Sequence, residues 1–184
     1  SNLIYFNPSV NCLTGSIPTT IGLLSGIMEE LYLNNNLFTG TIPPVFINFT
    51  NLLAIDFSSN KMEGTIPDWL WRLPNVFILG VGMNHFTGTL PSTLKYATNL
   101  EGFDVGENSL TGTIPTVLGS LTALTYISLR YNSFTGSIPA GLGMLANLLI
   151  FYAQSNQLDG TIPAALINVT YLSKIFVSSN HLTG

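Results

Sequence analysis

The residues that could support catalysis or bind a metal are few and widely separated in this chain of 184 residues. His85 and His181 are its two histidines, and they take the same position in two units of a repeating pattern, four repeats apart. If each repeat adds one strand, about 4.8 Å from the last, these side chains are roughly 19 Å apart, too far to share a metal ion. No carboxylate stands in a fixed relation to either histidine, so no Ser-His-Asp arrangement is indicated. We expect no metal site and no cofactor.

Two carboxylates, Asp56 and Asp104, occupy one column of the same pattern, two repeats or roughly 10 Å apart. This separation loosely resembles the acid pair of an inverting glycosidase. We favour the simpler interpretation as surface carboxylates, so we predict that the chain is not an enzyme. Cys12 is the single cysteine and cannot form a disulfide framework by itself, which leaves its pairing open.

One recurring stretch must position all of these residues, and NSLTGTIP from Asn108 shows it most plainly. Its copies follow one another at a constant interval, except that the first interval is one residue longer than the rest. A fixed period of this length is typical of a solenoid. We expect the one extra residue within 25–28, as a bulge on the convex side. The copies begin at Asn11, Asn36, Asn60, Asn84, Asn108, Asn132, Asn156 and Asn180.

The residues before each of these asparagines alternate in the way that indicates a strand. Apolar side chains lie five and three positions upstream, as Ile127 and Leu129 do for Asn132. This period of two predicts a short strand with one buried face. The asparagine ends the strand, where its amide can bond the turn backbone. We therefore predict that the eight asparagines stack as an internal ladder.

The segment that returns from each proline to the next strand has a different period. Leu118, Leu121 and Leu124 follow Pro115 at a spacing of three. This spacing indicates one or two turns of 3₁₀ or α-helix with a single apolar face.

The resulting pattern, LxxLxLxxNxLTGxIP, closely resembles the plant-type extracellular leucine-rich repeat of receptor-like kinase and receptor-like protein ectodomains and of polygalacturonase-inhibitor-like proteins. The resemblance covers essentially the whole chain, as about seven and a half repeats. It implies an α/β repeat fold: a right-handed solenoid with a concave parallel sheet, a short flanking second sheet and 3₁₀ or short helical backing. We expect a single domain over residues 1–184, a fragment without the cysteine-bearing caps of the family, and an extracellular or cell-surface location.

Composition narrows the classes of partner. Charged residues make up only 8% of the chain and the net charge is −4, so there is no basic stripe for nucleic acid. The apolar runs are too short to span a membrane. A surface so poor in charge is normally protected by glycans, by a partner or by self-assembly.

The outward positions of the predicted strands form the natural binding surface. Tyr and Arg are enriched at binding hot spots, so the expected site for a protein, peptide or glycan lies on the concave face. A cover of aromatic side chains over neighbouring strands would explain the same residues. Gly80, Gly82, Gly102 and Gly106 offer either close approach of a ligand or tight spacing of repeats. The predicted ligand-binding residues are Tyr126, Arg130, Tyr131, Tyr152, Asp104 and Tyr32.

Further side chains indicate modification or contact. Asn48 and Asn168 begin N-glycosylation sequons in the same row of the backing side, so we expect N-linked glycans on both. Trp71 would be a contact site if it were exposed, whereas Trp69 is expected to be half-buried. A hydroxylated residue follows each glycine of the repeat, which indicates either β-propensity or a strip for O-glycans or lateral packing. This row comprises Ser16, Thr41, Thr65, Thr89, Thr113, Ser137 and Thr161.

Two functions fit these observations. The first is a non-catalytic recognition or scaffold domain that presents its concave surface to a partner. The alternative is a structural glycoprotein that self-assembles into a fibre or a cell-surface coat.

Overall fold

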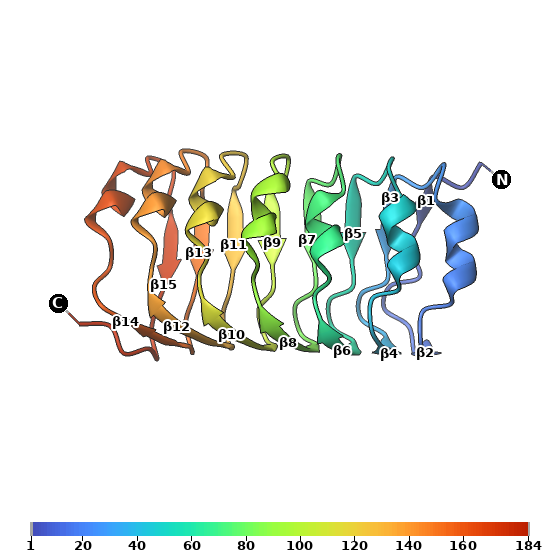
Figure 1. The fold of residues 1–184 in the computed structure, drawn as a ribbon, viewed down its shortest axis with the longest axis horizontal. Helices are drawn as coiled ribbons and strands as arrows, with labels where there is room; N and C mark the ends of the chain where they lie inside the picture. Colours follow the sequence, from blue (N-terminus) through green and yellow to red (C-terminus); the bar gives the residue numbers. More distant parts are fainter. Residues whose placement is uncertain (1, 184) are drawn as a thin grey trace.

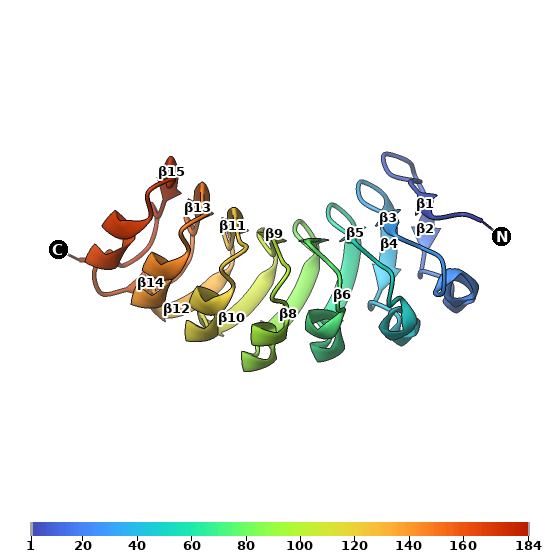
Figure 2. The ribbon, with the colours of Figure 1, turned by 90° about the horizontal axis from the view of Figure 1, so that it is seen from above.

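The computed structural model describes residues 2–183 as one curved solenoid in which each repeat makes one turn (Figure 1). Seen from above, the solenoid bends into an arc, with the longer sheet on the inner side and a row of 3₁₀ segments on the outer side (Figure 2). A second sheet runs along one flank. These features confirm the fold class predicted from the repeat.

The concave sheet is parallel and follows the order of the chain, because each repeat adds one strand beside the last. Neighbouring strands pair with a constant offset of one repeat from β3 onward, so equivalent positions form straight files across the sheet. Its strands are β1 (Tyr5–Phe6), β3 (Glu30–Tyr32), β5 (Ala54–Asp56), β7 (Ile78–Gly80), β9 (Gly102–Asp104), β11 (Tyr126–Ser128), β13 (Ile150–Tyr152) and β15 (Lys174–Phe176).

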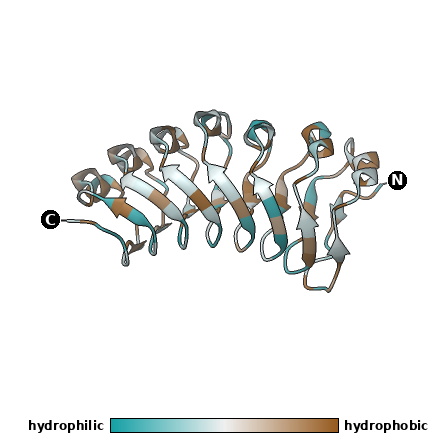
Figure 3. Cartoon of the chain, turned by 60° about the horizontal axis from the view of Figure 1, so that its bottom comes forward, coloured by the Kyte–Doolittle hydropathy of each residue, from teal (hydrophilic) through white to brown (hydrophobic). Residues whose placement is uncertain are grey.

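The flanking sheet is also parallel, and one apolar residue of each strand from β4 to β14 is buried in the core between less buried neighbours. Its strands are mostly pale in Figure 3, between the hydrophilic and hydrophobic ends of the scale. They are β2 (Thr14–Gly15), β4 (Leu37–Gly40), β6 (Lys61–Thr65), β8 (His85–Thr89), β10 (Ser109–Thr113), β12 (Ser133–Ser137) and β14 (Gln157–Asp159).

Each 3₁₀ segment of the described chain begins after a proline, whose fixed φ and missing N–H suit the start of a helical turn. η1 has six residues against five elsewhere. The N–H of buried Met28 bonds the Leu24 carbonyl four residues back, whereas the equivalent bond from Leu52 to Phe49 spans three, so the extra residue lies within the predicted range 25–28. The segments are η1 (Thr19–Leu24), η2 (Pro44–Asn48), η3 (Asp68–Arg72), η4 (Ser92–Tyr96), η5 (Thr116–Ser120), η6 (Ala140–Met144) and η7 (Ala164–Asn168).

The asparagine ladder forms as predicted along the interior. The side-chain amide of Asn108 donates to the carbonyls of Val81, Val105 and Gly106, and its Oδ1 accepts the N–H of Phe86 at 2.9 Å. Each amide thereby joins the concave sheet, the turn and the flank of adjacent repeats. Asn11 is the exception, because it lies exposed at the first repeat and bonds only local carbonyls.

A second row of asparagines on the return side was not predicted. Each side-chain amide donates to a carbonyl of the preceding repeat, at 2.8–3.1 Å, and so ties the backing segments together. The row comprises Asn51, Asn75, Asn99 and Asn147.

Trp71 is not exposed, so it is not a surface contact site. Its side chain is fully buried and meets Phe103 edge-on, with ring centroids 5.8 Å apart. The same position holds a glycine in η5 and η6, where a Cβ at Gly119 would collide with the backbone at Gly141. Trp69 is partly buried against the core, as expected.

Candidate ligand-binding face

Three aromatic side chains stack across the concave sheet on its last three strands. Tyr126 and Tyr152 meet edge-on with ring centroids 5.9 Å apart, and Tyr152 meets Phe176 at 5.1 Å. We call Tyr126, Tyr152 and Phe176 the aromatic ridge. The structure thus brings together two predicted residues and adds a third. Phe176 could have been found from the sequence, because it lies in the same file as Tyr152.

Arg130 lies beside the ridge in an ion pair, with its Nη2 2.9 Å from Oε1 of Glu107. Both side chains are about one third exposed (31% and 35%), so solvent screens the pair and it contributes little to stability.

Asp104, Ser128 and Tyr152 are cross-strand partners on three successive strands, β9, β11 and β13. Its Oδ1 accepts the N–H of Gly106 at 2.9 Å. Burial raises the pKa of Asp104, and the Gly106 N–H, the nearby Ser128 hydroxyl and Arg130 oppose that rise. Burial likewise raises the pKa of Tyr126, assisted by the charge of Asp104. The charge of Asp104 therefore acts on the Tyr126 hydroxyl of the aromatic ridge.

The glycines of the middle repeats have a role that the sequence did not reveal. A Cβ at Gly80 would collide with Oδ1 of Asp56, and one at Gly82 would lie 2.9 Å from Oδ1 of Asp104. These positions are glycine because carboxylates already lie over them. Of the two alternatives, tight spacing against the neighbouring repeat is the one that the structure supports at Gly80 and Gly82.

Two predicted residues lie away from this group. Tyr32 is on β3, four strands from Tyr126, where its ring meets Tyr5 at 5.8 Å and its hydroxyl donates to Glu30 at 3.0 Å. Burial and that hydrogen bond raise the pKa of Tyr32 to about 12. Tyr131 is 52% exposed in the turn after β11, in a left-handed conformation with φ of 50°. Neither residue makes a ring contact with the ridge.

The predicted modification sites are accessible. Asn48 and Asn168 are the last residues of η2 and η7, and both are exposed on the outer side.

On the flank, the Thr87 hydroxyl donates to the Gly64 carbonyl at 3.3 Å, and Thr111 and Thr135 repeat this contact. Cys12 is a free, exposed thiol.

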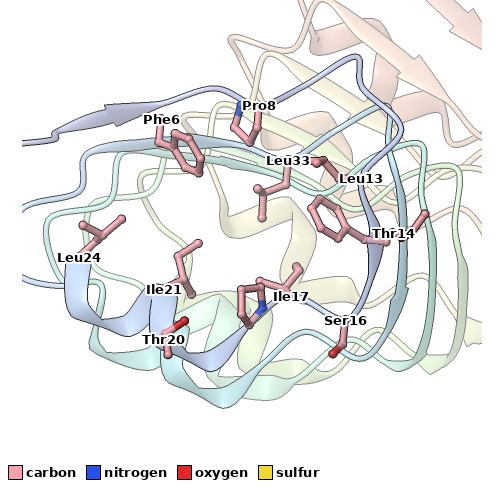
Figure 4. A pocket seen from close by; sticks show the side chains of 12 residues that line it. Phe6, Pro8, Leu13, Thr14, Ser16, Ile17, Thr20, Ile21, Leu24 and Leu33 are labelled. Carbon is pink, nitrogen blue, oxygen red and sulfur yellow. The ribbon is translucent and has the colours of Figure 1, made fainter.

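An apolar pocket of about 560 Å³ lies at the N-terminal end of the solenoid. Phe6 of β1, Ile21 of η1 and three residues from the adjoining loops point into it: Leu13, Ile17 and Leu33 (Figure 4). These are the side chains that the adjacent turn covers elsewhere in the molecule, so the pocket is the open end of the core.

Other kinds of site were sought over residues 2–183. That part of the chain contains no cluster of three or more His, Cys, Asp or Glu side chains that could hold a metal ion. Among the same residues, no helix has the length and apolar character needed to cross a bilayer.

Comparison with known proteins identifies the repeat. A family model described as leucine rich repeat matches residues 28–86, and a second of the same description matches residues 99–121 and 123–145. Together these stretches span more than half of the chain. The LRR receptor-like serine/threonine-protein kinase GSO2 of Arabidopsis thaliana is 44% identical over 52 residues, which are 28% of this chain and 4% of that protein.

Solved structures agree with the match. The crystal structure of PEPR1–AtPEP1 superposes with a TM-score of 0.90 and 34% identity, over 97% of this chain and 25% of that one. The Arabidopsis receptor kinase HAESA ectodomain, in complex with an N-terminally extended IDA peptide hormone ligand, gives a TM-score of 0.90 and 31% identity, over 97% of this chain and 30% of that one. The constant repeat period, the paired parallel sheets and these matches show that the chain belongs to the leucine-rich-repeat family.

Proposed function

We propose that this chain is a non-catalytic recognition domain of an extracellular or cell-surface protein, and that it binds a peptide on its concave face. The observation that carries the proposal is the aromatic ridge beside the Arg130–Glu107 pair. Aromatic and Arg side chains combine large contact area with polar tips, which is the composition of binding hot spots.

The ridge is not needed to build the solenoid. Ile127 and Phe151, which form the file between those of Tyr126 and Tyr152, are fully buried. Tyr126 and Tyr152 are only partly buried and Phe176 is exposed. Apolar area left on an ordered sheet gains free energy when a ligand covers it. The similar ectodomains of PEPR1 and HAESA are described in complexes with peptides, which supports the same class of ligand here.

The test begins with selection of peptides from a random phage-displayed library on the immobilised chain. Dissociation constants of the selected peptides are then measured for the parent and for the double variant Arg130→Ala, Tyr152→Ala. Tyr171→Ala is the matched control, because Tyr171 is an exposed tyrosine between η7 and β15. Loss of hot-spot side chains should weaken binding about thirtyfold or more, and the control should not.

Equal affinity for the parent and the double variant would refute a concave site at the ridge. Particle size measured by light scattering distinguishes the alternative function. Multimers that grow with concentration, with no dependence on Tyr152, would support the self-assembling structural glycoprotein instead.

A further inference from the structure

We propose that the peptide lies extended across the strands, with a basic side chain between Asp56 and Asp104 and an apolar side chain on the aromatic ridge. This inference rests on the proposed function and adds the chemistry of the ligand. Its basis is the division of the concave face into an anionic half and an aromatic half.

The anionic half spans β1 to β9. The strands of this half present Glu30, Asp56 and Asp104 and contain no Lys, Arg or His. Arg130 acts on Asp104 from the turn after β11, but its guanidinium is paired with Glu107. Such an arrangement attracts a cationic ligand and rejects an anionic one. The five Lys and Arg residues of the chain are Lys61, Arg72, Lys95, Arg130 and Lys174.

The two aspartates converge on one segment of β7 and its turn. Asp56, Gly80 and Asp104 are consecutive partners across the sheet. Oδ1 of Asp56 lies over Gly80 from one side, and Oδ1 of Asp104 lies over Gly82 from the other. Each Oδ1 accepts one backbone N–H, that of Ser58 at 2.8 Å or that of Gly106 at 2.9 Å. A carboxylate has about four acceptor positions, so both can still bond an ammonium or a guanidinium.

A separate observation links this acid pair to the ridge. Ser128 lies between Asp104 and Tyr152 in the same file and is fully buried. Its hydroxyl lies close to the Asp104 carboxyl and opposes the rise that burial causes in the pKa of that group. A peptide main chain that crosses from Asp104 to Tyr152 therefore follows one continuous file from the acid pair to the ridge.

The strand spacing sets the distance between the two ligand side chains. Gly80 on β7 is two strands from Tyr126 and three from Tyr152. At about 4.8 Å per strand this is roughly 10–14 Å, and an extended peptide advances about 3.3 Å per residue. The basic and apolar side chains should therefore be about three or four residues apart in the ligand.

The probes for the test are fluorescein-labelled Gly-Ser peptides that contain one Arg and one Trp, at spacings from adjacent to about eight residues. A second series replaces Arg with Gln. Binding to the parent chain is measured by fluorescence anisotropy. We expect the tightest binding at a spacing of about three or four, and loss of that preference in the Gln series.

Variants then locate the basic side chain. Asp56→Asn and Asp104→Asn keep the shape of the side chain and its bond to the turn, so both should fold. Each should weaken the best Arg probe about tenfold or more, because a hydrogen bond between charged groups is lost, and should leave its Gln counterpart unchanged. The matched control is Asp159→Asn, which removes the same charge from an exposed position on β14 in the flanking sheet.

The outcomes separate this inference from the proposed function. Probes that depend on Tyr152 but not on Arg, Asp56 or Asp104 would overturn the inference and leave the recognition face intact. Probes that bind without regard to Tyr152 would overturn both. A lack of measurable binding by every Arg probe, or equal loss with Asp159→Asn, would also overturn the inference.

Discussion

Replacing Asn108 tests whether the asparagine ladder holds the solenoid together. Its side chain makes four hydrogen bonds: three from its amide to the carbonyls of Val81, Val105 and Gly106, and one from the Phe86 N–H to its Oδ1. In Asn108→Ala all four are lost. The four losses do not destabilise the fold equally, because each of the three carbonyls retains another hydrogen-bond donor.

The neighbouring bonds give the magnitude. The carbonyl of Val81 still accepts Asn84, that of Val105 still accepts Asn132, and that of Gly106 still accepts the N–H of Met83. The Phe86 N–H is the group left without its partner, beside a fully buried side chain. An unsatisfied buried donor costs about 1–3 kcal/mol, so we expect Asn108→Ala to lower the free energy of unfolding by about 2 kcal/mol. Asn108→Asp should cost more, because a carboxylate without donors would face three carbonyl oxygens.

Urea unfolding followed by circular dichroism measures these changes. Asn11→Ala is the matched control, since Asn11 is exposed and bonds only the nearby carbonyls of Pro8 and Ser9. It should change stability by about 0.5 kcal/mol or less. Equal losses for Asn11→Ala and Asn108→Ala, or an Asp variant as stable as the parent at neutral pH, would refute the reasoning.

Further predictions concern single side chains. Asn48 and Asn168 should carry N-glycans when the chain is secreted by a eukaryotic host, and peptide mass spectrometry with and without glycosidase checks this; unmodified asparagine at both would contradict it. Because burial raises the pKa of Asp104, its contribution to stability is full below the unfolded pKa and is lost as pH rises through the folded value. Asp104→Asn should therefore be more stable than the parent at neutral pH, with the difference closing in acid, and a constant difference from acid to neutral urea titrations would count against it. Trp71→Ala should cost about 3–5 kcal/mol in urea unfolding, because it empties a buried site, whereas an exposed tryptophan would cost almost nothing. Tyr131→Asn should raise stability by about 1 kcal/mol, because asparagine tolerates the left-handed turn; a lower melting temperature would argue against strain there.

The repeat, the short strand before each asparagine and the interior asparagine ladder could be predicted from the sequence. A fixed period with apolar side chains five and three positions before an asparagine leaves one way to bury that pair in every copy. The outward positions follow by elimination, which is why Tyr126 and Tyr152 could be assigned to one face. Local spacing sufficed because each repeat contacts mainly its neighbours.

The tertiary structure decided what happens where a repeat departs from the pattern. Trp71 stands where two later repeats have Gly119 and Gly143, and only the packing of η3 against Phe103 shows that it is buried. Gly80 and Gly82 resembled an open floor until the carboxylates of Asp56 and Asp104 were located above them. The position of a side chain over a neighbouring strand depends on rotamers and on the space that the neighbour leaves. Residue type and spacing do not specify that space, because it is formed between strands that belong to successive repeats and are separated in the chain by a full turn of the solenoid.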